Sequence, residues 1–122
     1  MKSGLKRYLI LILLVVIPGC SESNTTASSS LLVSSNETGN WEVFSVDIGS
    51  SLVVQVTNDP EHDTNPVWSP DGEFMVVASA RQGDLELFLL DKEGAVVQQL
   101  TDNDYTDEQP AYSPDGEYLA FK

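Results

Sequence analysis

Basic residues are scarce in this chain of 122 residues. It has six Lys and Arg against 19 Asp and Glu, so its formal net charge is −13. Three of the six bases, Lys2, Lys6 and Arg7, precede Cys20, and no acid does. Contacts to phosphate need Lys and Arg, so this composition argues against nucleic acid or an anionic membrane surface as a partner. We interpret the acidity as that of a soluble, exported domain.

Cysteine and long apolar runs are equally scarce. Cys20 is the only cysteine, so a disulfide within the chain is excluded. The one long apolar run, Leu9–Ile17, is shorter than the roughly 20 residues that a membrane-spanning helix needs. It follows a positively charged N-terminus and is broken by Pro18-Gly19. These features predict a targeting segment over residues 1–19 that takes no part in the fold.

The end of this segment, Ile17-Pro18-Gly19-Cys20, resembles the lipobox of bacterial lipoproteins. The resemblance implies that Cys20 becomes the acylated first residue of the mature protein, which would anchor it to a membrane. Pro18 departs from the small residue or Ser that is usual there. Ser21 in the next position favours, by the same resemblance, an outer-membrane location facing the periplasm. A plain signal peptide and an uncleaved anchor are the alternatives.

Residues 20–40 are rich in Ser, Thr and Asn and poor in apolar residues. Such a segment buries too little apolar surface to offset the entropy lost on ordering. We therefore predict a flexible tether over residues 20–40. Leu31-Leu32-Val33 is a small apolar island inside it, which we expect to have no structural role; the alternative is a stray strand that docks on the propeller.

A nine-residue segment occurs twice in the chain. The segment Asn65–Glu73 recurs in similar form 44 residues later, as Gln109–Glu117. At this offset residues 39–78 align with residues 83–122 without a gap. A period of about 40–45 residues is typical of a four-stranded propeller blade. Identical pairs outside the repeated segment include Glu42/Glu86, Phe44/Phe88, Asp47/Asp91, Val53/Val97, Gln55/Gln99, Thr57/Thr101 and Asp63/Asp107.

Each copy contains a predicted β-turn with the sequence Ser-Pro-Asp-Gly. Proline presets φ at the first central position, Asp suits the second, and Gly accepts a positive φ without steric cost. We expect these residues to have a structural role, as the turn of a hairpin. They are Ser69, Pro70, Asp71 and Gly72 in the first copy, and Ser113, Pro114, Asp115 and Gly116 in the second.

The repeat predicts strands on both sides of each turn. Phe74–Ala78 and Leu85–Leu90 are nearly continuous apolar runs, which predicts burial on both faces, as in stacked blades. Together with a strand ending at Trp68 and one at Ala95–Leu100 they make one complete blade, over about residues 65–101. Partial blades are expected on either side, from strands at Trp41–Asp47, Leu52–Thr57, Pro110–Tyr112 and the chain end at Phe121-Lys122.

These residues resemble the TolB-type, WD-like β-propeller repeat. That repeat reads Leu-Thr, a polar loop, Pro-x-Trp-Ser-Pro-Asp-Gly and an apolar strand, and here it matches Leu100–Phe121 and Val56–Gly72. The resemblance covers about residues 40–122. It implies an all-β fold, a partial β-propeller over residues 41–122, with protein partners at the central channel or the loops. Because the chain stops in the middle of a repeat, we expect it to be a piece of a longer propeller.

The sequence offers few candidate metal-binding or catalytic residues. The only histidine, His62, lies in the acidic segment Asn58–Asp63, which is a possible metal site. The aligned segment 102–108 has no His, and neither segment has the glycine that a calcium loop needs. We favour a solvated loop and predict no metal and no cofactor. Asp63 and its counterpart Asp107 are expected to accept backbone hydrogen bonds there.

No catalytic residue is predicted. The chain has no Gly-x-Ser-x-Gly elbow, and a Ser/His/Asp triad would have to use His62 in its polar loop. With 19 acids, pairs of carboxylates arise by chance and carry no argument for glycoside chemistry. Trp68 and Tyr112 occupy the same position of the repeat. We therefore expect their side chains to pack between blades rather than to form an aromatic surface that binds a sugar.

Together these observations predict a non-enzymatic, exported and lipid-anchored protein of the cell envelope. Its TolB-like propeller blades would bind or scaffold a protein partner, and it would reach the membrane through the lipid on Cys20. The alternative is a gating or substrate-positioning propeller domain of a larger hydrolase or lyase. A catalytic domain after Lys122 would favour that alternative.

Overall fold

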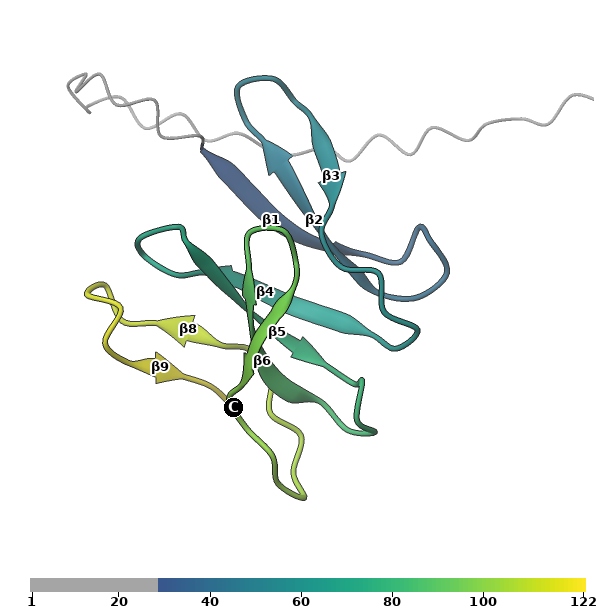
Figure 1. Cartoon of the computed structure of the whole chain (residues 1–122), viewed down its shortest axis with the longest axis vertical. Helices are drawn as coiled ribbons and strands as arrows, with labels where there is room; N and C mark the ends of the chain where they lie inside the picture. The colour runs from purple at the N-terminus through teal and green to yellow at the C-terminus, as the bar shows by residue number, and fades with distance from the viewer. Residues whose placement is uncertain (1–28) are drawn as a thin grey trace, which may run out of the picture.

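The structure, a computed structural model, describes residues 29–122, which form three antiparallel sheets and no helix (Figure 1). No segment of this part of the chain is therefore a helix able to cross a membrane. The targeting segment and Cys20 lie outside the described residues. Sheet A contains β1 (Ser30–Ser35), β2 (Glu42–Asp47) and β3 (Val53–Gln55). Sheet B contains β4 (Asp63–Trp68), β5 (Phe74–Ser79), β6 (Glu86–Asp91) and β7 (Val96–Gln99), and sheet C contains β8 (Ala111–Tyr112) and β9 (Leu119–Ala120).

Sheet B is the complete blade that the repeat predicts. Its four strands pair in chain order, each antiparallel to the next. The two central strands, β5 and β6, are buried along almost their whole length, because sheets cover them on both faces. The predicted fold class is confirmed: one four-stranded blade stands between a three-stranded and a two-stranded partial blade (Figure 1).

Sheet A has one strand more than we predicted. Residues 30–35, which we assigned to the tether, form β1 and pair with β2 over all six residues. The prediction that Leu31-Leu32-Val33 has no structural role is therefore wrong. The segment is too polar to order by itself, but β2 offers it a free edge, and Leu32 packs into the core between sheets A and B.

The strand pairing shows that β1 obeys the same offset of 44 residues. Ser35 pairs with Glu42 in sheet A, and Ser79 pairs with Glu86 in sheet B. Ser35 and Ser79 also each accept a hydrogen bond from the backbone N–H two residues later. Sheet A therefore corresponds to the second, third and fourth strands of a blade. The repeat begins at Ser30 or earlier, at least nine residues before Gly39, where the sequence alignment starts.

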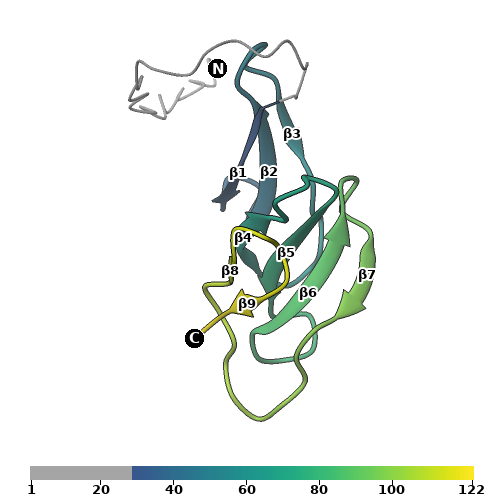
Figure 2. The same ribbon diagram turned by 90° about the vertical axis from the view of Figure 1, so that its left-hand side faces the viewer.

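Sheet B lies between sheets A and C (Figures 1 and 2). Side chains pack between the sheets in two cores. Successive residues of β5 point to opposite faces, so Met75 and Val77 enter the first core while Val76 and Ala78 enter the second. The first core, between sheets A and B, contains Val43, Met75, Val77, Phe88 and Leu90, with Leu32, Val56 and Trp68 at its border. The second core, between sheets B and C, contains Val76, Ala78 and Leu87, with Val67, Leu85, Leu89, Tyr112 and Leu119 at its border.

The two repeated aromatic residues take equivalent places in these cores. Trp68 packs against the first core and Tyr112 against the second. Each is partly buried and contacts the sheet that precedes its own in the chain. The prediction that they pack between blades is confirmed. Burial raises the pKa of the Tyr112 phenol, and the carboxylate of Asp71 adds to this rise.

A proline lies inside the first strand of sheet B. Pro66 cannot donate to a strand ladder, and the pairing of β4 with β5 shifts register between Thr64 and Val67. The residue before it, Asn65, has φ +49°, and its repeat counterpart Gln109 has φ +56°. The bulge places Asn65 and Pro66 opposite the single residue Val77 of β5, which has no register partner in β4, so Pro66 lies where the pairing is interrupted.

One glycine brings the loops of neighbouring blades together. Gly94, in the loop between β6 and β7, has φ +88°. A Cβ atom added there would lie 2.1 Å from the carbonyl oxygen of Val56 in the preceding blade. Only a residue without a side chain permits this approach.

We expect Gly94→Ala to lower the free energy of unfolding by about 2–4 kcal/mol, because it adds a steric clash to the cost of a left-handed backbone. Gly72→Ala is the matched control. Gly72 has φ +70° but open space around it, so only the backbone cost of about 1 kcal/mol applies. Urea unfolding followed by tryptophan fluorescence measures both. Equal losses would show that the contact with Val56 is unimportant.

Candidate interaction site

The first Ser-Pro-Asp-Gly turn is closed by its own side chains. The Gly72 N–H donates to the Ser69 carbonyl at 2.8 Å, and Gly72 has φ +70°. The Ser69 hydroxyl donates to the Asp71 carboxylate, which also accepts the Glu73 N–H at 3.0 Å. The Phe74 N–H donates to the Ser69 hydroxyl oxygen at 3.0 Å. All four turn residues thus serve to hold the hairpin of β4 and β5.

The second turn repeats the same bonds. Gly116 donates to the Ser113 carbonyl at 2.9 Å, and the Ser113 hydroxyl donates to the Asp115 carboxylate, which accepts the Glu117 N–H at 3.0 Å. In both turns the serine hydroxyl, and after it the backbone N–H, holds the pKa of the aspartate below its usual 3.8.

A second repeated network lies in the interior of the blades. The Thr57 hydroxyl donates to Glu42 at 2.6 Å and accepts the Val43 N–H at 2.9 Å. Thr101 does the same with Glu86 and with the Leu87 N–H. Both glutamates are almost fully buried. The identical pairs Glu42/Glu86 and Thr57/Thr101 in the sequence signalled this network, and sequence reasoning overlooked it.

The repeated aspartates differ from our expectation. Asp63 is fully buried and accepts two hydrogen bonds from the Arg81 guanidinium, at 3.1 and 3.2 Å. Asp107 accepts a bond from the Asn103 side-chain amide at 2.7 Å. Both carboxylates therefore accept hydrogen bonds from side chains, whereas we predicted hydrogen bonds from backbone N–H groups. Arg81 also stacks over the Phe88 ring, 4.7 Å from its centroid.

The acidic segment Asn58–Asp63 does not gather its side chains around one point. His62 Nδ1 accepts the Trp41 N–H at 3.2 Å, while the Asp63 carboxylate is occupied by Arg81. The Asn40 amide donates to the carbonyls of the loop, at Asp59 and Glu61. Within residues 29–122 no three His, Cys, Asp or Glu side chains cluster as a metal site would require.

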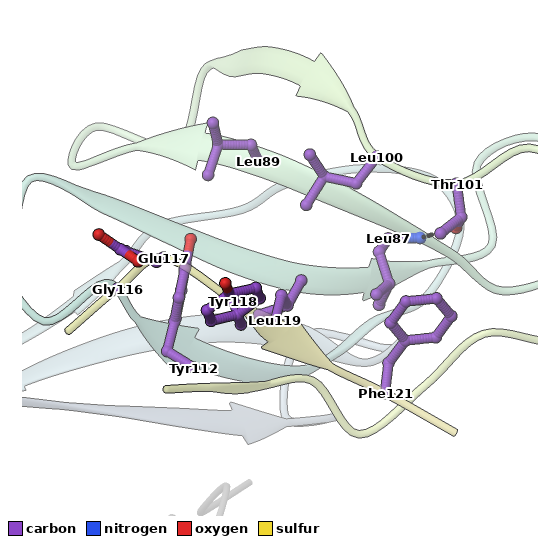
Figure 3. Close-up of a pocket in the computed structure, with 10 residues that line it drawn as sticks. All are labelled: Leu87, Leu89, Leu100, Thr101, Tyr112, Gly116, Glu117, Tyr118, Leu119 and Phe121. Atoms are coloured by element: carbon purple, nitrogen blue, oxygen red, sulfur yellow. Dashed lines mark hydrogen bonds between the residues drawn. The ribbon is translucent and has the colours of Figure 1, made fainter. Parts of the chain in front are cut away.

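An apolar groove with a volume of about 320 Å³ lies between sheets B and C. Leu87 and Leu89 of β6 face the side chains of β9 and its flanks across it (Figure 3). Sequence reasoning missed this groove, because its lining residues come from strands and loops that meet only when the sheets stack. Its lining residues are Leu87, Leu89, Leu100, Thr101, Tyr112, Gly116, Glu117, Tyr118, Leu119 and Phe121.

Comparison with known proteins identifies the blades. The sequence profile of the TolB β-propeller domain, PD40, matches residues 23–122. This chain belongs to the TolB β-propeller family. The resemblance of the repeat to TolB-type blades is thereby confirmed, and the matched region includes β1. No curated protein sequence matches the chain.

Two solved TolB structures resemble the fold. One, from Agrobacterium tumefaciens, is 27% identical with a TM-score of 0.71, and the match covers 75% of this chain and 33% of that one. The other, TolB from Acinetobacter baumannii, is 26% identical with a TM-score of 0.63, and the match covers 75% and 23%. The chain therefore spans about a third of one TolB protein and about a quarter of the other.

The two turn aspartates should titrate below pH 3.8, since hydrogen bonds favour their ionised forms in the folded chain. Their contribution to stability is present above pH 3.8 and is lost as the pH falls through the lowered folded pKa. NMR titration of the carboxyl carbons measures each pKa. Ser69→Ala should raise the pKa of Asp71 and leave that of Asp115, the internal control, unchanged. Parallel movement of both would contradict the assignment of the shift to the serine hydroxyl.

Arg81→Met should destabilise the fold by about 3–5 kcal/mol, because it leaves the fully buried Asp63 carboxylate without its cation. Lys92→Met is the matched control, since Lys92 pairs with Glu73 at 3.0 Å but both side chains are exposed. Such a pair contributes at most about 1 kcal/mol. Chemical unfolding of both variants measures the difference. If the double variant Arg81→Met, Asp63→Asn is no more stable than Arg81→Met alone, the loss does not come from the unpaired charge.

Proposed function

We propose that this protein is a lipid-anchored binding module of the bacterial cell envelope, built from TolB-type blades. The observation that carries the proposal is the match of residues 23–122 to the TolB β-propeller domain, whose blades the described sheets form. The repeated polar groups of the blades form hydrogen bonds within turns and between strands, so their role is structural.

The anchoring half of the proposal rests on the N-terminal sequence. Ile17-Pro18-Gly19-Cys20 has the pattern of a lipobox, and a positively charged, apolar leader precedes it. Acylation of Cys20 would place a lipid ten residues before β1 begins at Ser30. The blades would then be held close to a membrane surface, with Ser21 favouring the outer membrane.

The envelope location is supported by the relatives. The solved structures that resemble this fold are described as TolB from two bacteria. A propeller of this family is a scaffold that presents loops and grooves to other proteins, and fold alone does not define the partner. Binding, without catalysis, is therefore the function we assign to the described blades.

We expect the full chain, expressed in a bacterium with its leader, to incorporate radiolabelled palmitate and to sediment with membranes. Cys20→Ser should abolish the label and release the protein into the soluble fraction, because it removes the chain's only thiol. Ser21→Ala is the matched control and should keep both properties. Membrane sedimentation of the Cys20→Ser variant without label would overturn lipid anchoring.

A further inference from the structure

We propose that the loop between β2 and β3, residues 48–52, inserts into the surface of a zwitterionic lipid bilayer when the chain is anchored. Its aliphatic side chains would enter the boundary between the lipid headgroups and the acyl chains, and this contact would fix the orientation of the blades on the membrane. The inference deepens the proposed function, because it names the surface that the anchored module touches, and it rests on the lipid at Cys20.

The β2–β3 loop presents two large aliphatic side chains to solvent. Ile48 is 44% exposed and Leu52 is 60% exposed. The loop is closed by its own hydrogen bonds, since the Asp47 N–H donates to the Leu52 carbonyl at 2.9 Å. The N–H and the hydroxyl of Ser50 both donate to the Asp47 carboxylate at 2.7 Å. The loop is therefore a defined hairpin with an apolar side chain on each side of its tip.

This exposure is a property of the position in the blade. In sheet B, which has another sheet packed on each face, the equivalent residues are open as well. Val96, the counterpart of Leu52, is 48% exposed, and the side chain of Lys92, the counterpart of Ile48, is 48% exposed. The fourth strands β3 and β7 each pair with one strand only. A neighbouring blade therefore leaves these positions accessible.

The β2–β3 loop lacks the charges that its counterpart in sheet B carries. Residues 48–58 contain no Asp, Glu, Lys or Arg, although charged residues make up 20% of the chain. The counterpart loop has Lys92 and Glu93 where this loop has Ile48 and Gly49. Charged groups resist transfer out of water, whereas exposed aliphatic groups favour the lipid interface. Only the loop of sheet A therefore has the chemistry for contact with a bilayer.

The chain enters the blades beside this loop. The Ile48 N–H donates to the Ser29 carbonyl at 3.0 Å, and Ser30 pairs with Asp47. Figures 1 and 2 show the loop at the upper end of the described residues, next to the start of β1. Nine residues lead from Cys20 to Ser29, a span of at most about 30 Å. A lipid on Cys20 would hold the loop within that distance of the bilayer.

Such a short anchor makes a weak surface contact sufficient. Tethering turns the contact into an intramolecular event with a high effective concentration, so two aliphatic side chains are enough to orient a chain that the lipid already holds. Charge selects the surface. Residues 29–122 contain 18 acids against three bases, so a second copy of this chain and an anionic lipid surface would both be repelled. A zwitterionic bilayer is the occupant that avoids this repulsion.

Quenching of tryptophan by brominated phosphatidylcholine tests the contact. The full chain, expressed with its leader and purified from membranes, is reconstituted into these vesicles as Leu52→Trp or as Val96→Trp, the matched position in sheet B. After subtraction of the signal of the parent chain, which contains Trp41 and Trp68, we expect quenching at position 52 to exceed that at position 96 at least about threefold. Equal quenching at the two positions would overturn the inference.

A charge variant tests the chemistry of the loop. With Ile48→Trp as the reporter, Leu52→Glu should reduce quenching at least about threefold, because a carboxylate beside the reporter resists the lipid interface. Val96→Glu, the matched control with the same change in net charge, should change quenching less than about 1.5-fold. Unchanged thermal unfolding of both variants excludes loss of fold. Equal effects of the two substitutions would assign the result to net charge and overturn the inference.

Palmitate labelling of the same preparations reports the anchor separately. A labelled chain that binds vesicles but shows no quenching at position 52 overturns the lipid contact and leaves the anchored module intact. An unlabelled chain that does not bind vesicles overturns both. Shielding of the tryptophan at position 52 from acrylamide, without quenching by the brominated lipid, would show that a second copy or another protein covers the loop, and would overturn the inference.

Discussion

The packing of one sheet face on the next is the interaction on which this structure depends. A single blade is apolar on both faces, so neither face can be left to water without losing much of its stability. In the first core Phe88 and Leu90 of sheet B are buried against Val43 of sheet A. Burial of each such side chain contributes about 1.5–3 kcal/mol. Sheet B has another sheet packed on each of its faces.

Polar groups make this packing specific. Each blade repeats a buried Glu–Thr pair that also receives a backbone N–H, and sheet B adds the ion pair of Asp63 with Arg81. Buried charges are costly without partners, so these contacts fix which strands lie together and in which register. The other acidic groups of the described residues, except the buried Asp107, are exposed or partly exposed. The described part of the chain therefore has a strongly negative surface.

The groove follows from the same repeat. Leu87, Tyr112 and Leu119, which line the groove, are the counterparts 44 positions later of Val43, Trp68 and Met75 in the first core. The groove is therefore the equivalent, between sheets B and C, of the packed space between sheets A and B.

The sequence by itself determined the period, the turns and the class of fold, because these depend on local chemistry. The Ser-Pro-Asp-Gly turns and the apolar runs of β5 and β6 specify hairpins whatever surrounds them. Only the tertiary structure decided that the weakly apolar residues 30–35 form β1, since their order comes from the edge of β2 and the face of sheet B. It also decided the partner of Asp63, because Arg81 has no repeated counterpart: Glu37 stands in its place. The groove likewise exists only once the sheets are stacked, because its lining residues come from strands and loops that meet in space and not along the chain.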